Sequence, residues 1–295
     1  MYLICMKGYY NMDLTSPRTI RNIQEQFGFT FKKGLGQNFL TARNILEEIV
    51  DAAEIESGVI EVGPGFGVLT SELAQNSDKV VTIEIDERLI DVLDYTLAEY
   101  DNVKIINEDI LKLDLKKVID DEFNGEKVSI AANLPYYITT PIITKLLEEK
   151  LPIKNIVVMV QKEVAERMSA KPSTKDYGAI TVLCQYYTEP SIVANVPASL
   201  FVPPPKVDSA VLKLKVLDKP SVEVKDEGVF FRVVKAAFSQ RRKPLLNCLS
   251  ANFPIPKDEI STLLESIGIA PSRRGETLSL KEFANIADTL LQKIK

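Results

Sequence analysis

The residues best suited to chemistry follow predicted strands, and the first of them are glycines. A short apolar run, formed by Val59, Ile60 and Val62, leads into Gly63-Pro64-Gly65-Phe66-Gly67, and an amphipathic stretch begins at Val68. This order predicts a strand, a tight glycine turn and a helix. Glycines let the backbone pass close to a ligand, and the helix start offers free N–H groups. Gly63 and Gly65 are therefore candidate cofactor-binding residues.

Two alternatives stay open for this turn. It can be an ordinary strand-to-helix turn that binds nothing. It can also be a dinucleotide site, but the Gly-x-Gly-x-x-Gly pattern requires glycine at position 68, where this chain has Val68. A nicotinamide dehydrogenase is disfavoured for that reason, and the residues downstream must decide.

Two acidic residues follow the next two predicted strands. Glu84 ends the strand predicted over 80–84, 21 residues after Gly63, and a carboxylate there can accept hydrogen bonds from both hydroxyls of a ribose. Asp109 follows the strand predicted over 103–107 and could bind an adenine amino group. Alone, Glu84 could be a solvated carboxylate and Asp109 a helix cap. However, open α/β sheets bind ligands at the carboxyl ends of their strands, so the agreement among these residues favours a binding site.

The sharpest motif is Asn133-Leu134-Pro135-Tyr136, which follows the strand predicted over 127–132. The proline makes the turn rigid, and the tyrosine offers a flat apolar face. The Asn133 carboxamide oxygen and a backbone carbonyl can together accept both hydrogens of one exocyclic amine. Drawing the lone pair of an adenine amine out of its ring would make it nucleophilic without a general base. An ordinary turn before a helix is the alternative; we predict a catalytic role for all four residues.

The composition is compatible with chemistry that needs no histidine as a general base. The chain has no histidine, which excludes Ser-His-Asp hydrolysis, His-Glu-x-x-His metalloproteases and most zinc sites, and no metal site is predicted. Three cysteines stand far apart, which fits a reducing cytosol rather than a disulfide framework. No apolar run approaches the roughly 18 residues that a membrane span needs. We therefore expect a cytoplasmic protein.

The charge is distributed unevenly. Residues 217–295 hold 13 Lys and Arg against 10 Asp and Glu, a net charge of +3, whereas residues 1–216 hold 23 against 31, a net charge of −8. A basic C-terminal segment on an acidic main domain is compatible with a polyanionic partner. The alternative is that these basic residues lie at the ends of helices and contact only solvent. The basic residues that could contact such a partner form three clusters: Lys32 and Lys33; Arg241, Arg242 and Lys243; Arg273 and Arg274.

Strands and helices alternate over much of the chain, which predicts a parallel sheet with helical crossovers. Strands are predicted over 59–63, 80–84, 103–107, 127–132, 155–160, 191–196 and 207–216. Helices are predicted over 17–27, 44–53, 67–76, 87–99, 112–120, 140–149, 161–170, 227–240, 244–252, 256–267 and 280–291. The predicted division is a loose extension over 1–14, a main domain over 15–216 and a helical domain over 217–295.

Taken together, these motifs resemble those of the ribosomal RNA adenine N6,N6-dimethyltransferases, most of all the members acting on bacterial small-subunit (16S) rRNA. The resemblance covers nearly the whole chain. Beyond the motifs above, it includes Lys33 to Leu40, the loop Phe201-Val202-Pro203-x-Pro205-x-Val207-x-Ser209, Phe238 to Lys243, and Arg273 to Glu276.

The resemblance implies an α/β fold: a Rossmann-like, seven-stranded class I methyltransferase sheet with a small C-terminal all-helical domain. It implies S-adenosylmethionine as cofactor, contacted by Asn38, Leu40, Gly63, Glu84, Asp109 and Asn133. Tyr136 and Phe201 would sandwich the target base.

The implied reaction is transfer of methyl groups to N6 of two adjacent adenosines near the 3′ end of 16S rRNA during ribosome biogenesis. The partner would be the small ribosomal subunit, and a monomer is expected. Two rivals stay open: a large-subunit rRNA dimethylase of the antibiotic-resistance type, and a ribosome-assembly factor with secondary catalytic activity.

Overall fold

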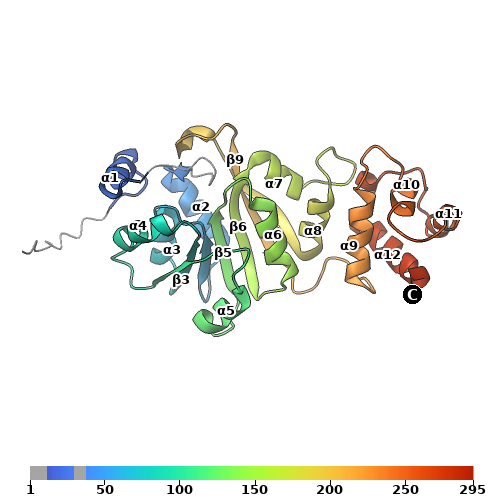
Figure 1. Ribbon diagram of the computed structural model, residues 1–295, viewed down its shortest axis with the longest axis horizontal. Helices are drawn as coiled ribbons and strands as arrows, with labels where there is room; N and C mark the ends of the chain where they lie inside the picture. Colours follow the sequence, from blue (N-terminus) through green and yellow to red (C-terminus); the bar gives the residue numbers. More distant parts are fainter. Residues whose placement is uncertain (1–11, 30–37, 295) are drawn as a thin grey trace, which may run out of the picture. The chain divides into compact units, whose positions relative to one another are not determined.

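A computed structural model of the chain describes residues 12–29 and 38–294 (Figure 1). The helices are α1 Pro17–Phe27, α2 Arg43–Ala53, α3 Val68–Gln75, α4 Ile90–Thr96, α5 Leu115–Phe123, α6 Thr139–Glu148, α7 Lys162–Met168, α8 Ala179–Tyr187, α9 Glu227–Ala237, α10 Leu245–Ser250, α11 Lys257–Ser266 and α12 Leu280–Ile294. Short 3₁₀ turns lie at Glu87–Leu89, Ala198–Leu200 and Gly275–Thr277. The strands are β1 Phe39–Leu40, β2 Val59–Val62, β3 Val80–Glu84, β4 Val103–Asn107, β5 Val128–Asn133, β6 Ile153–Gln161, β7 Thr188–Val196, β8 Phe201–Val202 and β9 Ser209–Val216.

The main sheet has seven strands, as predicted, and their order is β4-β3-β2-β5-β6-β9-β7. The pairs β3–β4, β2–β3, β2–β5 and β5–β6 are parallel. The chain order therefore reverses beside β2, where β3 lies on one side and β5 on the other. Such a reversal leaves a crevice at the carboxyl ends of the strands, which is where open α/β sheets bind ligands.

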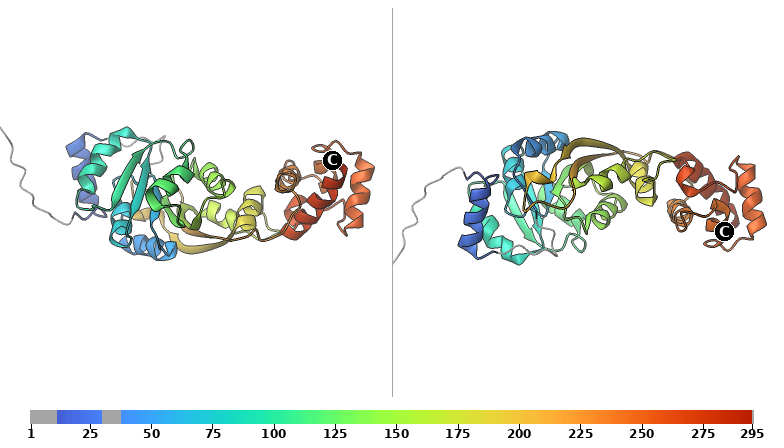
Figure 2. Two further views of the ribbon diagram at one scale, coloured as in Figure 1. Left: turned by 90° about the horizontal axis from the view of Figure 1, so that it is seen from below. Right: turned by 90° about the horizontal axis from the view of Figure 1, so that it is seen from above.

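Burial explains why the central strands can be read from the sequence. Every residue of β2 and β3 is buried, as are the first five residues of β5. Figures 1 and 2 show helices on both faces of this part of the sheet. A strand covered on both faces needs mostly apolar side chains in both directions, which gives the Val- and Ile-rich segments of the sequence.

The chain packs into two compact units, each with its own apolar core. One unit comprises residues 1–162 and 193–213, and the other comprises 163–192 and 214–295. In the first, Ile49, Val59 and Leu73 are fully buried in one cluster, whereas Phe230 and Phe283 are fully buried in the cluster of the second. None of the helices described here is long and apolar enough to cross a membrane.

This grouping differs from the predicted division at residue 216. Helices α7 and α8 precede the last strands of the sheet, yet they pack with the C-terminal helices, because Tyr186 of α8 stacks on Phe230 of α9 at a centroid distance of 4.8 Å. The functional division into a methyltransferase domain and an RNA-contacting domain stays a prediction.

The loose extension predicted over residues 1–14 lies mostly outside the described residues. Leu14 is described, and it is buried in the first core at 5% exposure, so it is not part of a loose segment. Three elements were not predicted from the sequence: helix α8 and the short antiparallel pair β1–β8.

Candidate active site

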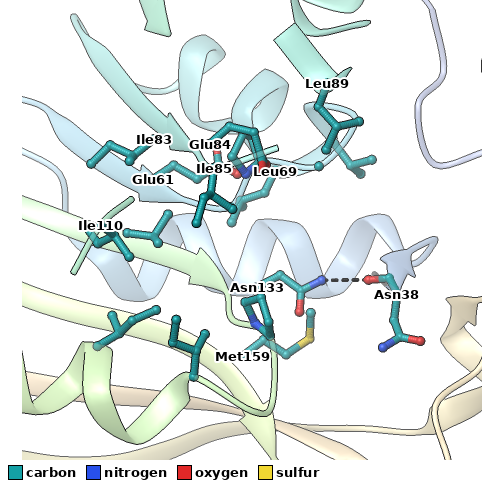
Figure 3. Close-up of a pocket in the computed structure, with 18 of the residues that line it drawn as sticks. Asn38, Glu61, Leu69, Ile83, Glu84, Ile85, Leu89, Ile110, Asn133 and Met159 are labelled. Atoms are coloured by element: carbon teal, nitrogen blue, oxygen red, sulfur yellow. Dashed lines mark hydrogen bonds between the residues drawn. The ribbon is translucent and has the colours of Figure 1, made fainter. Parts of the chain in front are cut away.

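Four strand ends meet around one pocket, as their parallel order requires. Glu84 at the end of β3 is level with Asn107 at the end of β4, and Asn133 ends β5. The pocket has a volume of about 1060 Å³, including space open to solvent. All seven predicted cofactor-binding residues line it: Asn38, Leu40, Gly63, Gly65, Glu84, Asp109 and Asn133. Figure 3 shows several of them around the cavity.

The glycine turn needs its glycines for two different reasons. Gly63 has φ +72° and Gly65 has φ +60°, a backbone region that side chains strongly disfavour. A Cβ at Gly63 would meet no atom within 4 Å, so this backbone is open to a ligand. A Cβ at Gly65 would instead stand 2.7 Å from the ring of Phe39, which stacks on Phe66 at 4.3 Å. Gly65 is therefore required by the packing of the pocket wall.

Glu84 lies in the pocket with only 6% of its surface exposed. Burial raises the pKa of its carboxyl to about 7, although the backbone N–H groups of Asp86, Gly65 and Ile85 favour the ionised form. The Asp86 N–H donates to Oε1 at 2.8 Å. Glu84 is thus a fixed, buried acceptor, a suitable partner for a pair of hydroxyl groups.

A second buried carboxyl, Glu61, also lines the pocket and was not singled out from the sequence. It is 1% exposed, and the Thr70 hydroxyl donates to its Oε2 at 2.5 Å. Burial raises the pKa of Glu61 to about 8, so it is largely protonated at neutral pH. Its place within an apolar strand hid it from pattern reasoning.

Asp109 lies at the pocket edge and also starts the turn after β4. Its Oδ1 accepts a hydrogen bond from the Leu111 N–H at 3.0 Å, and Lys112 lies 3.7 Å from its Oδ2. The cap interpretation and the binding interpretation therefore both fit this residue, since a carboxylate has acceptor sites for more than one donor.

The turn after β5 holds Asn133 in one orientation. Its Nδ2 donates to the main-chain carbonyl of Asn38 at 3.0 Å, drawn as a dashed line in Figure 3. The carboxamide oxygen is therefore left as an acceptor in the pocket. The Pro135 carbonyl accepts from the Ile138 N–H at 3.1 Å and the Thr139 hydroxyl at 3.2 Å. The Leu134 carbonyl has no such partner among residues 12–29 and 38–294, which makes it the second available acceptor.

The aromatic residues near this site differ in their exposure and in whether they line the pocket. The hydroxyls of Tyr136 and Ser209 are hydrogen-bonded at 2.8 Å, and burial raises the pKa of the Tyr136 phenol. Phe201 is only 2% exposed, and it does not line the pocket. Tyr137, which sequence reasoning passed over, lines the pocket and is 59% exposed. The base sandwich of Tyr136 and Phe201 stays a prediction.

Strand β8 holds the N-terminal wall of the pocket in place. Leu40 is paired with Phe201 and Phe39 with Val202, and both the N–H and the hydroxyl of Thr41 donate to the Leu200 carbonyl at 2.9 Å. The segment that contains Leu40 and the loop that contains Phe201 therefore form one small sheet.

The predicted RNA-binding residues differ in their surroundings. Arg273 is held inside its unit: its Nε donates to the Thr277 hydroxyl at 3.1 Å, and its guanidinium forms an ion pair with Glu282. Arg241, Arg242, Lys243 and Arg274 are exposed. Lys32 and Lys33 lie outside the described residues.

Two solved structures share the fold of this chain. A dimethyladenosine transferase from Plasmodium falciparum is 29% identical with a TM-score of 0.70, and the match covers 84% of this chain and 95% of that one. The 23S rRNA methyltransferase ErmE is 27% identical with a TM-score of 0.66, covering 86% of this chain and all of that one. Together with the pocket at the strand ends, these matches define a Rossmann-like methyltransferase, as predicted.

The family model for ribosomal RNA adenine dimethylase matches residues 28–292, so the chain belongs to that family. Curated relatives include proteins of Bacillus mycoides (strain KBAB4) and Bacillus cereus (strain B4264), each named "Ribosomal RNA small subunit methyltransferase A". Each is 54% identical over 285 residues, 95% of this chain and 98% of the relative. The family and enzyme class predicted from the sequence are confirmed.

Proposed function

We propose that the chain transfers methyl groups from S-adenosylmethionine to N6 of two adjacent adenosines near the 3′ end of 16S rRNA. The observation that carries the proposal is the fixed Asn133 carboxamide, which lines the same pocket as Gly63 and Glu84. The names of the 54% identical relatives support the small-subunit substrate. Because that substrate is assembled in the bacterial cytoplasm, the proposed location is cytoplasmic.

The residues present fit S-adenosylmethionine. Gly63 leaves open space where a side chain would stand, and Glu84 provides a buried carboxylate for a ribose. Asp109 lines the pocket and would bind an adenine amine, and Asn38 and Leu40 line the same pocket. When bound, S-adenosylmethionine supplies a methyl group attached to a positively charged sulfur.

The chain's own task is to hold the target amine so that its lone pair is available. The Oδ1 of Asn133 and the Leu134 carbonyl would accept the two amine hydrogens, which draws the lone pair out of the adenine ring. Tyr136 does not serve as the base, because burial raises the pKa of its phenol from an already high value of 10.0. Positioning of the amine therefore provides most of the rate enhancement.

The proposal is tested by incubating the protein with labelled S-adenosylmethionine and either under-methylated small subunits or large subunits. We expect label in 16S rRNA, recovered as N6,N6-dimethyladenosine. Label confined to 23S rRNA would instead identify a large-subunit dimethylase, with the substrate of the 23S rRNA methyltransferase ErmE. Tight subunit binding without label would favour an assembly factor.

A further inference from the structure

Three loops of the second unit lie side by side: residues 171–176 between α7 and α8, 239–244 between α9 and α10, and 270–277 between α11 and α12. The first and second loops meet where the Arg241 guanidinium donates to the Lys175 carbonyl. The first and third meet at a hydrogen bond from the Ser173 N–H to the Glu276 carbonyl, at 2.7 Å. The Leu245 N–H, directly after the second loop, donates to the Arg273 carbonyl of the third at 2.6 Å. We call this assembly the three-loop surface.

The three-loop surface is anchored from below by buried groups. Tyr177, at the end of the first loop, is fully buried, and its ring lies 6.0 Å from that of Phe238. Arg273 is tied to Thr277 and Glu282, as described above. Anchoring of this kind keeps the loops in one arrangement, so the backbone positions that carry the outward side chains are fixed relative to one another.

Those outward side chains are mostly cationic. The three loops hold seven Lys and Arg residues against two acids, Asp176 and Glu276, so their net charge is 7 − 2 = +5. Arg273 is paired internally, and Arg274 lies 4.0 Å from Glu276. Across the described part of the chain, no ion pair involves Lys171, Lys175, Arg242 or Lys243, and all four are exposed. Like charges held close together repel one another, and a bound polyanion would remove that cost.

The surface lacks what base recognition would need. The aromatic residues that border the loops, Tyr177 and Phe238, pack against each other and offer no exposed ring for stacking. Lysine and arginine without aromatic partners bind phosphates, which position an RNA without reading its sequence. An acidic protein could also bind a cationic surface, and a comparison of small subunits with protein-free 16S rRNA distinguishes the two kinds of partner.

We propose that Lys171 and Lys175 bind the phosphate backbone of folded rRNA, beside the RNA-binding residues already predicted on this surface, Arg242, Lys243 and Arg274. The identity of the RNA rests on the proposed function. The two lysines come from a loop that sequence motifs did not single out, and only the contacts between loops place them beside the basic C-terminal cluster.

The test measures affinity for under-methylated small subunits and for protein-free 16S rRNA at several salt concentrations. The variants are Lys171→Ala with Lys175→Ala, Arg242→Ala with Lys243→Ala, and all four together. Arg241 is left intact because it joins two loops. The control is Lys219→Ala with Lys257→Ala, which removes the same charge from exposed residues of the same unit outside the three loops. Thermal unfolding confirms that each variant is folded.

Each pair should weaken binding to both RNAs by roughly tenfold and lower the salt slope by about two, with a loss of about four for the quadruple variant. The control should match the wild type. Unchanged affinity and slope for the Lys171 and Lys175 pair would overturn the proposal. Weaker binding to subunits with unchanged binding to protein-free rRNA would also overturn it, because the surface would then contact a ribosomal protein. Loss of RNA binding in a protein that does not methylate 16S rRNA would contradict the proposed function but not this surface.

Discussion

The side-chain amide of Asn133 donates a hydrogen bond to the main-chain carbonyl of Asn38 at 3.0 Å, which joins the end of β5 to the residue before β1. Strand β1 is paired in turn with β8, where Leu40 is opposite Phe201. The proposed catalytic turn, the wall of the cofactor pocket and the loop of the proposed base sandwich are therefore connected through one set of hydrogen bonds. Disturbing Asn38 or β8 should change the orientation of the Asn133 carboxamide.

Replacing Glu84 should weaken S-adenosylmethionine binding without unfolding the protein. Glu84 is 6% exposed and lines the pocket, so losing a charged hydrogen-bond acceptor there should cost about 1.5–3 kcal/mol of binding free energy. Titration calorimetry on Glu84→Ala and the near-isosteric Glu84→Gln measures this loss. Wild-type affinity in both variants would mean that Glu84 does not bind the cofactor.

Cofactor affinity should also depend on pH through Glu84. Burial raises the pKa of its carboxyl to about 7, and the protonated form has lost acceptor capacity. Affinity should therefore decrease by about tenfold per pH unit below about pH 7 and level off above it. Calorimetry across this range on the wild type and Glu84→Gln tests the assignment, because the variant should lose the dependence. The same pH profile in both proteins would assign it to another group.

Glu61 should make the ligand-free protein less stable as pH rises. Its pKa is raised from 4.5 in the unfolded chain to about 8 in the fold, so the folded state binds more protons between these values. Its contribution to the free energy of unfolding is complete below about pH 4.5 and is lost as pH rises to about 8. Urea unfolding at about pH 5.5 and about pH 8.5 should show this decrease in the wild type and less of it in Glu61→Gln. The exposed Glu47→Gln is the matched control; equal slopes in all three proteins would be evidence against a buried, protonated Glu61.

Tyr137 should contribute to RNA recognition at the pocket mouth. Its ring is 59% exposed and lines the pocket, whereas Phe201 is buried. If the ring stacks on a base of the substrate, Tyr137→Ala should lower kcat/KM for RNA by a free energy of about 1–3 kcal/mol, and Tyr137→Phe should be nearly normal. Tyr95→Ala removes another exposed tyrosine, at 44% exposure, as a control. A normal kcat/KM for Tyr137→Ala would show that this ring has no part in recognition.

The central sheet and the pocket could be predicted from the sequence because burial leaves a strong local pattern there. The buried residues of β2, β3 and β5 are mostly apolar, and the last residue of each strand lines the pocket. Because the strands are parallel, their last residues lie together at the carboxyl edge of the sheet, and this does not depend on where the helices begin or end.

The features that were missed depend on contacts between distant parts of the chain. The pair β1–β8 has two residues per strand, 161 positions apart at Leu40 and Phe201, which is too short for any periodic pattern. Helix α8 buries five of its nine residues, so it has no clear polar face to mark its period. Arg273 looks like part of a basic cluster until its ion pair with Glu282 is seen.

The proposed role of the Asn133 carboxamide can be measured by single-turnover methylation of under-methylated small subunits. Asn133→Ala removes the acceptor, and Asn133→Asp replaces the donor to the Asn38 carbonyl with a second oxygen. Both should lower the single-turnover rate by roughly a hundredfold to a thousandfold, as for loss of a preorganised transition-state contact, while S-adenosylmethionine affinity changes far less. Methylation by Asn133→Ala at the wild-type rate would show that the Asn133 carboxamide has no catalytic role.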